Sequence, residues 1–358
     1  MKIFKATRKY EEWLREQLGV FEDDLSFKAK KLAEDPSAFL RGTFYRWMQL
    51  LPEVCRKAAQ APEVLAVGDL HAANFGTWQN ARGELVWGIN DFDEAAPLPY
   101  TFDLIRLAVS VAVAGDSQEL ATGLEEACES ILEGYRASLE AGGRAILLNE
   151  EQAWLRDVYL QGGRSAEAFW EKLERLPDIE FEIPEAARIA LEAALLKGAE
   201  YRLKHRLAGV GSLGRPRYTA LATVKGERIA RETKPLLPSA ALWAQKRLKG
   251  AEIYYEEVLA RAVRSLDPMV KVYEGWVVRR LAPDSRRIEL TELGPERDEK
   301  RLLVAMGWET GNIHLGTPMA VKSVLADLKE RKPNWLVKAT RKMENAVLED
   351  WETWKENK

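Results

Sequence analysis

The sequence contains little cysteine and histidine, the residues from which most zinc sites are built. Its 358 residues include two cysteines, Cys55 and Cys128, and three histidines. The histidines do not show metal-ligand spacing, which argues against a zinc site. Both cysteines lie in apolar segments that read as helices, so we expect two buried thiols in a reducing cytosol.

An excess of charge of one sign is also missing. Lysine and arginine total 53 against 56 acidic residues, a formal net charge of −3, whereas general nucleic-acid binders are usually strongly basic. The longest apolar run, Leu107 to Gly115, is too short to span a bilayer. The first residues, M-K-I-F-K-A-T-R-K-Y-E-E-W, are charged and lack the apolar core of a signal peptide. We therefore expect a cytoplasmic protein with no membrane or general nucleic-acid partner.

What the chain does contain is a set of polar residues at strand ends, between Val67 and Glu94. An apolar stretch leads into Gly68, and a second predicted strand runs from Leu85 to Ile89. The polar residues that follow these two strands are Asp69, Asn74, Asp91 and Asp93. Gly68 and Asp69 alone would indicate no more than an Asx-type turn. Carboxylates and an amide on two strand-ended loops can converge, and oxygen ligands of this kind suit magnesium.

Two segments of this stretch resemble known phosphotransferases. G-D-L-H-A-A-N, residues 68–74, looks like the catalytic loop of the aminoglycoside phosphotransferase and choline kinase branch of the kinase-like fold. I-N-D-F-D, residues 89–93, resembles the metal-binding loop of that branch, the counterpart of D-F-G in protein kinases.

More of the chain resembles a bacterial family known as domain of unknown function 2252. The segments that carry this resemblance are F-L-R-G-T at Phe39, G-D-L-H-A-A-N-F-G at Gly68, N-D-F-D-E at Asn90, F-D-L-I-R-L-A-V-S at Phe102, G-V-G-S-L-G at Gly209 and V-V-R-R-L at Val277. They are scattered over most of the chain. The resemblance implies a kinase-like site, but it does not supply a substrate, because none is assigned to the family.

The resemblance to kinases implies roles in transfer of a phosphoryl group from ATP. Asp69 would accept the proton of an acceptor hydroxyl or orient that hydroxyl. His71 belongs to the same catalytic loop, and we expect it to fix the shape of the loop by hydrogen bonds. Asn74 and Asp91 would bind a magnesium ion that bridges the phosphates, and Asp93 would hold a second ion. The implied cofactors are ATP and Mg²⁺.

A β-hairpin is predicted after the glycine-rich segment at Gly209. Alternating apolar residues run from Tyr218 to Val224, Lys225–Gly226 indicates a turn, and Arg228 to Leu236 reads as a second strand. Glycines let backbone N–H groups approach a phosphate closely. G-x-G-x-x-G is a weak signal alone, but before a hairpin it favours a kinase-type loop over a Rossmann site. The residues expected to cover the phosphates are Gly209, Gly211, Ser212 and Gly214.

A kinase also needs a lysine that holds the phosphates, and Lys234 near the end of the second strand is the candidate. Its context is R-E-T-K and not V-A-I-K, so a surface lysine beside surface charges is the other interpretation. We expect a helix from Ser239 to Val263 to supply the acidic partner of this lysine. Glu252 is the first choice, with Glu256 and Glu257 as alternatives.

Two further residues have a structural and a functional interpretation. Asp103 lies at the start of a predicted helix, Phe102 to Ala114, and the resemblance to kinases implies that it braces the catalytic loop by hydrogen bonds. Arg41 lies near the start of a helix predicted from Ala38 to Ala61. It is placed to reach a phosphate, or else it is a solvated or ion-paired arginine on a core helix.

The order of these parts differs from that of ordinary kinases, in which the glycine loop and the lysine strand come first. Here Asp69 and Asp91 precede Gly209 and Lys234. The sequence therefore predicts an α+β, two-lobed, protein kinase-like fold in circularly permuted order, with a mainly helical large lobe and a small lobe of antiparallel sheet plus helix. The alternative is that the hairpin belongs to an unrelated β-domain.

Three regions follow from this interpretation. Residues 1–207 form the large helical lobe with the catalytic and metal-binding loops. Residues 208–283 form the small β-rich nucleotide-binding lobe. Residues 284–358 supply C-terminal helices, starting at Pro295, that pack on the large lobe.

The first functional hypothesis is a phosphotransferase that uses Mg-ATP and acts on a small molecule or a protein. The alternatives are a kinase-like nucleotidyltransferase, a nucleotide-binding or interaction module without turnover, and a nonspecific metal-dependent hydrolase. The acceptor substrate and the oligomeric state cannot be read from the sequence. The helical region from Leu147 to Glu185, which contains Trp154 and Trp170, is a candidate source of acceptor contacts.

Overall fold

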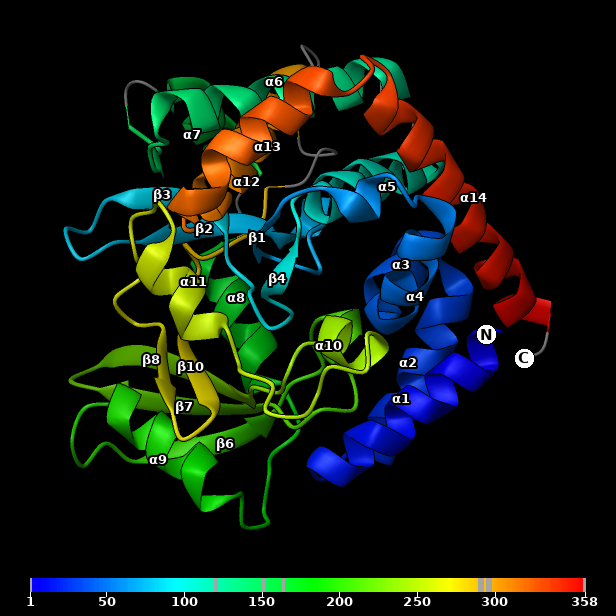
Figure 1. The fold of residues 1–358 in the computed structure, drawn as a ribbon. Coiled ribbons are helices and arrows are strands. Elements are labelled where there is room, and N and C mark those ends of the chain that lie inside the picture. The colour runs from blue at the N-terminus through cyan, green and yellow to red at the C-terminus, as the bar shows by residue number, and fades with distance from the viewer. Residues whose placement is uncertain are drawn as a thin grey trace.

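The computed structural model describes residues 2–118, 122–149, 152–162, 165–288, 293 and 298–356. Pro295, the expected start of the C-terminal helices, lies outside the described residues. Helices dominate and the strands form small antiparallel sheets, so the α+β class is confirmed. The largest sheet lies at the lower left of Figure 1, and most helices lie above it and to its right.

The two ends of the chain lie side by side (Figure 1). The N-terminal helices are α1 (Ile3–Gln17), α2 (Glu22–Glu34), α3 (Pro36–Gly42) and α4 (Phe44–Val54). The last helix, α14 (Trp335–Glu356), packs against this group. The rings of Phe4 and Trp354 stack with their centroids 4.8 Å apart. Neighbouring termini are the condition that makes circular permutation of a domain tolerable.

The middle of the chain supplies two small sheets and the central helices. In the first sheet, β1 (Glu63–Ala66) pairs with β4 (Ala96–Pro99). In the second, the order is β2 (Phe75–Gln79), β3 (Leu85–Ile89) and β5 (Ile146–Leu147). The helices of this region are α5 (Thr101–Gln118), α6 (Leu124–Ala141), α7 (Ala153–Gln161), α12 (Glu299–His314) and α13 (Pro318–Glu330). Within the described residues, no helix has both the length and the apolar character needed to cross a membrane.

Helices α6 and α12 cross closely because glycines face the partner backbone. A Cβ on Gly134 would clash with the carbonyl oxygen of Val304, and a Cβ on Gly307 would clash with that of Ile131. Side chains that pack around this crossing are fully buried, including those of Tyr135 and Met306. The crossing therefore fixes the position of α12 against the strands that carry the polar loops.

The third sheet has five strands, in the order β6-β7-β8-β10-β9. Its members are β6 (Tyr201–His205), β7 (Tyr218–Val224), β8 (Glu227–Pro235), β9 (Lys271–Tyr273) and β10 (Trp276–Leu281). Helix α9 (Glu185–Ala194) covers one face, where Leu191 packs with Tyr218 and Val278. Helix α8 (Ala166–Glu174) packs on Leu221, which points to the opposite face because strand side chains alternate.

Strand β6 differs from the expectation for residues 1–207, which places this segment in the helical lobe. Tyr201–His205 pairs with β7 in register from Tyr201↔Ala222 to His205↔Tyr218. The glycine-rich segment therefore connects two strands of the sheet and does not precede it. The sequence signal for this strand is weak because Lys204 occupies a buried position, 3% exposed, where a strand usually carries an apolar residue. Its ammonium donates to the carbonyl oxygens of Glu174 and Leu176, each at 3.0 Å.

Two predicted helices are also divided. The segment predicted as one helix from Ala38 to Ala61 forms α3 and α4, which meet at Thr43. The segment from Ser239 to Val263 forms two short helices, α10 (Ala240–Ala244) and α11 (Tyr255–Arg261). Between these two, Lys246 and Gly250 adopt positive φ angles of 59° and 70°, which a helix does not allow.

Candidate functional site

The predicted polar loops and the glycine-rich segment meet at one pocket of about 80 Å³. Of the predicted site residues, those that line it are Asp69, His71, Asn74, Asp91, Asp93, Gly209, Gly211 and Ser212. Lys234 contacts two of them from β8, while Gly214 lies just beyond the pocket. Glu252 does not belong to this group. The structure therefore brings most of the predicted site together from segments far apart in the sequence.

The loop after β1 is held in place by Asp103 of α5. The carboxylate of Asp103 accepts hydrogen bonds from the backbone N–H groups of Val67, at 2.7 Å, and Gly68, at 2.9 Å. His314 of α12 lies 2.9 Å from the same carboxylate, and Tyr135 contacts the other ring nitrogen at 2.8 Å. These groups are buried. The prediction that Asp103 braces this loop is confirmed.

Asp69 is fixed by Arg106, a residue that the sequence interpretation did not single out. Arg106 Nε donates to Asp69 Oδ1 at 2.7 Å, and Nη2 of the same guanidinium also contacts this oxygen. The guanidinium carbon lies 4.9 Å from the ring centroid of Phe44 and 5.0 Å from that of Trp47. The one available signal was an arginine inside the apolar run F-D-L-I-R-L-A-V-S.

The second oxygen of Asp69 faces the glycine-rich segment. A Cβ on Gly211 would lie 3.7 Å from Asp69 Oδ2, so little separates the two. Burial raises the pKa of the Asp69 carboxyl, although Arg106 opposes this effect. A carboxylate with one oxygen anchored and the other facing a pocket has the geometry of a proton acceptor.

His71 and Asn74 shape the same loop. The backbone N–H of His71 donates to Asn74 Oδ1 at 2.8 Å, and the backbone N–H of Asn74 donates to the carbonyl oxygen of His71 at 2.9 Å. The expected bonding within the loop is thus present through the backbone of His71. Burial, followed by the charge of Arg41, lowers the pKa of the His71 ring well below its usual value, so the ring is neutral at pH 7.

The loop after β3 carries two carboxylates that share one lysine. Lys234 Nζ lies 3.1 Å from Asp91 Oδ1 and 2.6 Å from Asp93 Oδ2. Burial alone would raise the pKa of Asp91, but the charges of Lys234 and Arg279 outweigh it and hold the pKa well below its usual range. For Asp93, burial and the nearby charge of Asp91 raise the pKa.

This arrangement differs from the one predicted for Lys234. Glu252 is exposed and lies between α10 and α11, outside any helix, and Glu256 is exposed as well. The carboxylate of Glu257 pairs instead with Arg261 at 2.8 Å. Because Lys234 is 5% exposed, the alternative of a surface lysine is wrong too. Its partners come from the loop after β3, far from β8 in the sequence.

Glu232, two residues before Lys234, is the centre of a buried ion cluster that was not predicted. Its carboxylate contacts Arg206 at 2.5 Å, Arg217 at 2.6 Å and Arg279 at 2.8 Å. Burial alone would raise the pKa of Glu232, but the three arginines hold it well below its usual value. Arg217 also donates to Ser212 Oγ at 2.7 Å. The cluster thereby ties the sheet to the glycine-rich segment.

The glycine-rich segment, residues 209–214, forms a tight turn, which we call the glycine turn. Hydrogen bonds from Lys28 and Phe21 hold it in place. Gly209 and Gly214 adopt positive φ angles of 72° and 92°, which other residues rarely adopt. A Cβ on Gly214 would also clash with the Leu25 side chain. Lys28 Nζ donates to the carbonyl oxygen of Gly211 at 3.1 Å, and the backbone N–H of Phe21 donates to that of Gly214 at 3.0 Å.

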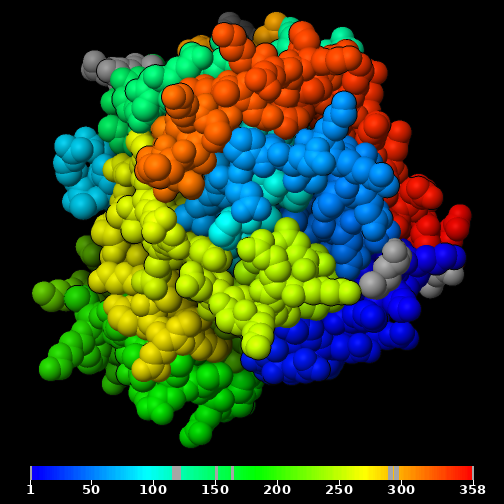
Figure 2. Space-filling model, in the orientation of Figure 1, coloured from blue at the N-terminus to red at the C-terminus, as the bar shows by residue number. Residues whose placement is uncertain are grey.

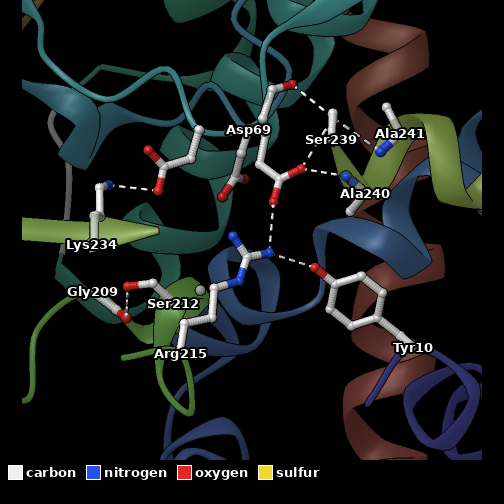
Figure 3. Close-up of polar contacts among 12 residues, drawn as sticks. Tyr10, Asp69, Gly209, Ser212, Arg215, Lys234, Ser239, Ala240 and Ala241 are labelled. Carbon is white, nitrogen blue, oxygen red and sulfur yellow. Dashed lines mark hydrogen bonds and ion pairs between the residues drawn. The ribbon is translucent and has the colours of Figure 1, made fainter. Parts of the chain in front are cut away.

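Glu94, at the end of the N-D-F-D-E segment, joins the parts that surround the pocket. Its carboxylate accepts hydrogen bonds from Arg215 Nη2 at 3.2 Å and from the backbone N–H of Ala240 at 2.6 Å. Figure 3 shows Arg215 pointing also toward Tyr10, whose hydroxyl lies 2.6 Å from Nη2. Helix α10, near the centre of Figure 2, lies against the blue N-terminal region at this point.

The donor set of the pocket fits a magnesium ion that also binds phosphate oxygens. Among the described residues there is no group of three or more histidine, cysteine, aspartate or glutamate side chains arranged to hold a metal. Magnesium does not require such a group, because one or two carboxylates and phosphate oxygens suffice. Asp93 Oδ1 is buried and lacks a hydrogen-bond partner. Asn74, Asp91 and Asp93 would hold the ion.

Comparison with known proteins gives one result. Residues 21–171 match the model of a family described as an uncharacterized protein conserved in bacteria (DUF2252). No curated protein and no solved structure matches the chain. The matched range contains the catalytic-loop segment, the metal-loop segment and the F-D-L-I-R-L-A-V-S run of α5. For residues 21–171, the similarity to domain of unknown function 2252 that the motifs indicate is thus confirmed.

Proposed function

We propose that this protein is a phosphotransferase that uses Mg-ATP, in a circularly permuted kinase-like fold. The observation that carries the proposal is the convergence of Asp69, Asn74, Asp91 and Asp93 on the pocket beneath the glycine turn. Phosphoryl transfer requires positioning and charge neutralisation more than covalent chemistry. This pocket places a candidate proton acceptor and oxygen ligands beside the glycine turn within one small volume.

In this proposal, Asp69 acts on the acceptor hydroxyl. Oδ2 would accept the hydroxyl proton, because Oδ1 is occupied by Arg106. The raised pKa of the carboxyl brings it closer to the range in which a base works well near neutral pH. Arg106 is a positioning residue, because it holds Asp69 without lining the pocket.

Asn74, Asp91 and Asp93 hold the metal in this proposal, and Lys234 holds phosphate. Magnesium, when bound, supplies the positive charge that neutralises the phosphate oxygens. In the structure, Lys234 supplies the positive charge beside Asp91 and Asp93. Its ammonium would turn from these carboxylates toward the phosphates, because two cations at the same carboxylates repel each other.

Binding of a whole nucleotide requires the pocket to open. Sites for drug-sized ligands have volumes of about 300–1,000 Å³, whereas this pocket encloses about 80 Å³. Opening would break the hydrogen bonds that Lys28 and Phe21 make with the glycine turn. The volume as it stands suits a phosphate group and its metal more than a nucleoside.

The order of the elements supports the permuted kinase arrangement. From the glycine turn onward the chain forms β7, the lysine-bearing strand β8, the helices α10 and α11, and then β9 and β10. This is the internal order expected of a kinase small lobe. The helices after residue 298 and the adjacent N-terminal helices then belong to the part that carries the catalytic loop, as a permutation requires.

Titration calorimetry tests the nucleotide site. We expect ATP to bind wild-type protein in the presence of magnesium, and the affinity to fall about tenfold or more in Asp91→Ala, because a carboxylate ligand is lost. Glu252→Ala is the matched control and should bind as the wild type does. ATP that fails to bind wild type with or without magnesium would exclude the proposal.

The mass of the reaction product separates this proposal from nucleotidyl transfer. The same residues would serve both reactions, so the site geometry favours neither. An acceptor that gains a phosphate supports phosphoryl transfer, whereas an acceptor that gains AMP supports the nucleotidyltransferase alternative.

A further inference from the structure

The wall of the pocket formed by α2 and α3 carries two cations whose charges are not matched by carboxylates. Lys28 of α2 is 7% exposed, and its single hydrogen bond goes to the carbonyl oxygen of Gly211. Arg41 of α3 is partly buried, and its Nε donates to the carbonyl oxygen of Ser37 at 3.2 Å. Within the described part of the chain, neither residue forms an ion pair.

Such cations are costly without an anion. An ammonium has three donors and a guanidinium has five, so most donors of Lys28 and Arg41 are unused by the protein. Burial, followed by the charge of Arg215, lowers the pKa of Lys28 to about 8, which leaves the residue charged at neutral pH. A buried charge without a counter-ion destabilises a fold. Retaining two such charges at a pocket indicates that the pocket binds an anion there.

Three other cations at the site have acidic partners. Lys234 pairs with Asp91 and Asp93, and Arg215 pairs with Glu94. Arg106 pairs with Asp69. Lys28 and Arg41 are therefore additional to the cations that balance the acidic loops.

The two cations line the same pocket as Asp69, and the charges of both interact with its carboxyl. The charge of Arg41 is one of those that lower the pKa of the Asp69 carboxyl. Lys28 binds the carbonyl oxygen of Gly211. The acidic groups whose charges act most on Lys28 are Glu11, Glu94 and Asp69. An anion bound at Lys28 and Arg41 would thus lie next to the carboxylate assigned as the base.

We infer that Lys28 and Arg41 form an oxyanion subsite for the acceptor, which is therefore a hydroxyl compound that bears a phosphate or carboxylate group. This inference rests on the proposed function, which identifies the bound compound as the acceptor. A cationic amine acceptor would meet repulsion at this wall. The nucleotide phosphates are the other possible source of an oxyanion, and the experiment must separate the two.

The probe is inorganic phosphate, titrated by calorimetry into the full chain with and without saturating Mg-ADP. The variants are Lys28→Met, which keeps the volume of the side chain, and Arg41→Gln. Lys30→Met is the matched control, because Lys30 is exposed on the same helix. Thermal melting of each variant verifies that it is folded, and the two variants provide independent readings.

We expect phosphate to bind wild-type protein both with and without Mg-ADP. Lys28→Met and Arg41→Gln should each weaken phosphate binding about tenfold, the effect of losing a charge-assisted hydrogen bond. Lys30→Met should have no effect, and Mg-ADP affinity should change much less than phosphate affinity in all three variants.

Competition between phosphate and Mg-ADP would overturn the inference, because the oxyanion would then belong to the nucleotide. Undiminished phosphate binding in folded Lys28→Met and Arg41→Gln proteins would overturn it as well. If Mg-ADP does not bind at all, the proposed function fails, while the phosphate titration alone still reports whether the oxyanion subsite exists.

Discussion

Replacing Asp69 by asparagine should lower kcat for phosphoryl transfer by about 10²–10⁴-fold, the range typical of a lost general base. The change keeps the size of the side chain and removes the proton acceptor at Oδ2. Mg-ATP affinity should change little, because Asn74, Asp91 and Asp93 are intact. The measurement is the transfer of the labelled phosphate of γ-labelled ATP to water or to an acceptor. ATP binding is measured on the same variants.

Asp157→Asn is the matched control for this prediction. Asp157 is exposed on α7, away from the pocket, so its replacement should leave both rate and binding unchanged. A normal turnover rate in Asp69→Asn would refute the assignment of Asp69 as the base. A loss of nucleotide binding equal to the loss of kcat would show that Asp69 acts in binding and not in the chemical step.

Gly307→Ala should cause a large loss of stability, about 3 kcal/mol or more. The new Cβ would overlap the carbonyl oxygen of Ile131 across the α6–α12 crossing. The gain in helix propensity, about 1 kcal/mol, is too small to offset the separation of two helix backbones. Urea unfolding followed by circular dichroism measures the difference.

Gly19→Ala provides the control for backbone effects. Gly19 lies between α1 and α2, and a Cβ there would meet no atom within 4 Å. Its free energy of unfolding should stay within about 0.5 kcal/mol of wild type. If Gly307→Ala were equally neutral, the close approach of α6 and α12 would be wrong.

The elements predicted best from the sequence are those whose local pattern and turn chemistry agree. Alternating residues from Tyr218 to Val224 form β7 with the predicted bounds. The turn at Lys225–Gly226 has positive φ angles at both residues, 52° and 84°. This is the backbone that two-residue hairpins require. Local sequence decides such elements, so local reasoning finds them.

The elements that were missed depend on contacts distant in the sequence. Strand β6 contains Arg202 and Lys204, and the buried Lys204 ammonium is satisfied by carbonyl oxygens near the end of α8. The segment predicted as a helix from Ser239 to Val263 breaks at Lys246 and Gly250, and its first part, α10, is held by Glu94 of the loop after β3. Neither partner can be identified from the segment itself.

The site was predictable in its residue types but not in its pairings. Motif spacing identified Asp69, Asn74 and Asp91, and the structure places all three at one pocket. The partner of Lys234 was chosen by analogy with kinases as a helix glutamate. The structure places Lys234 against Asp91 and Asp93 instead. Which acid meets a buried lysine is set by the packing of elements distant in the sequence, which spacing along the chain does not encode.

Anomalous diffraction from crystals grown with Mn²⁺ and ADP tests the central claim most directly. Manganese replaces magnesium in oxygen-ligand sites and gives a signal that locates the ion. The account predicts an ion within coordination distance of Asn74 and Asp91, with the Lys234 ammonium turned toward the phosphates. A nucleotide and ion bound elsewhere, with Lys234 still joining Asp91 and Asp93, would contradict it.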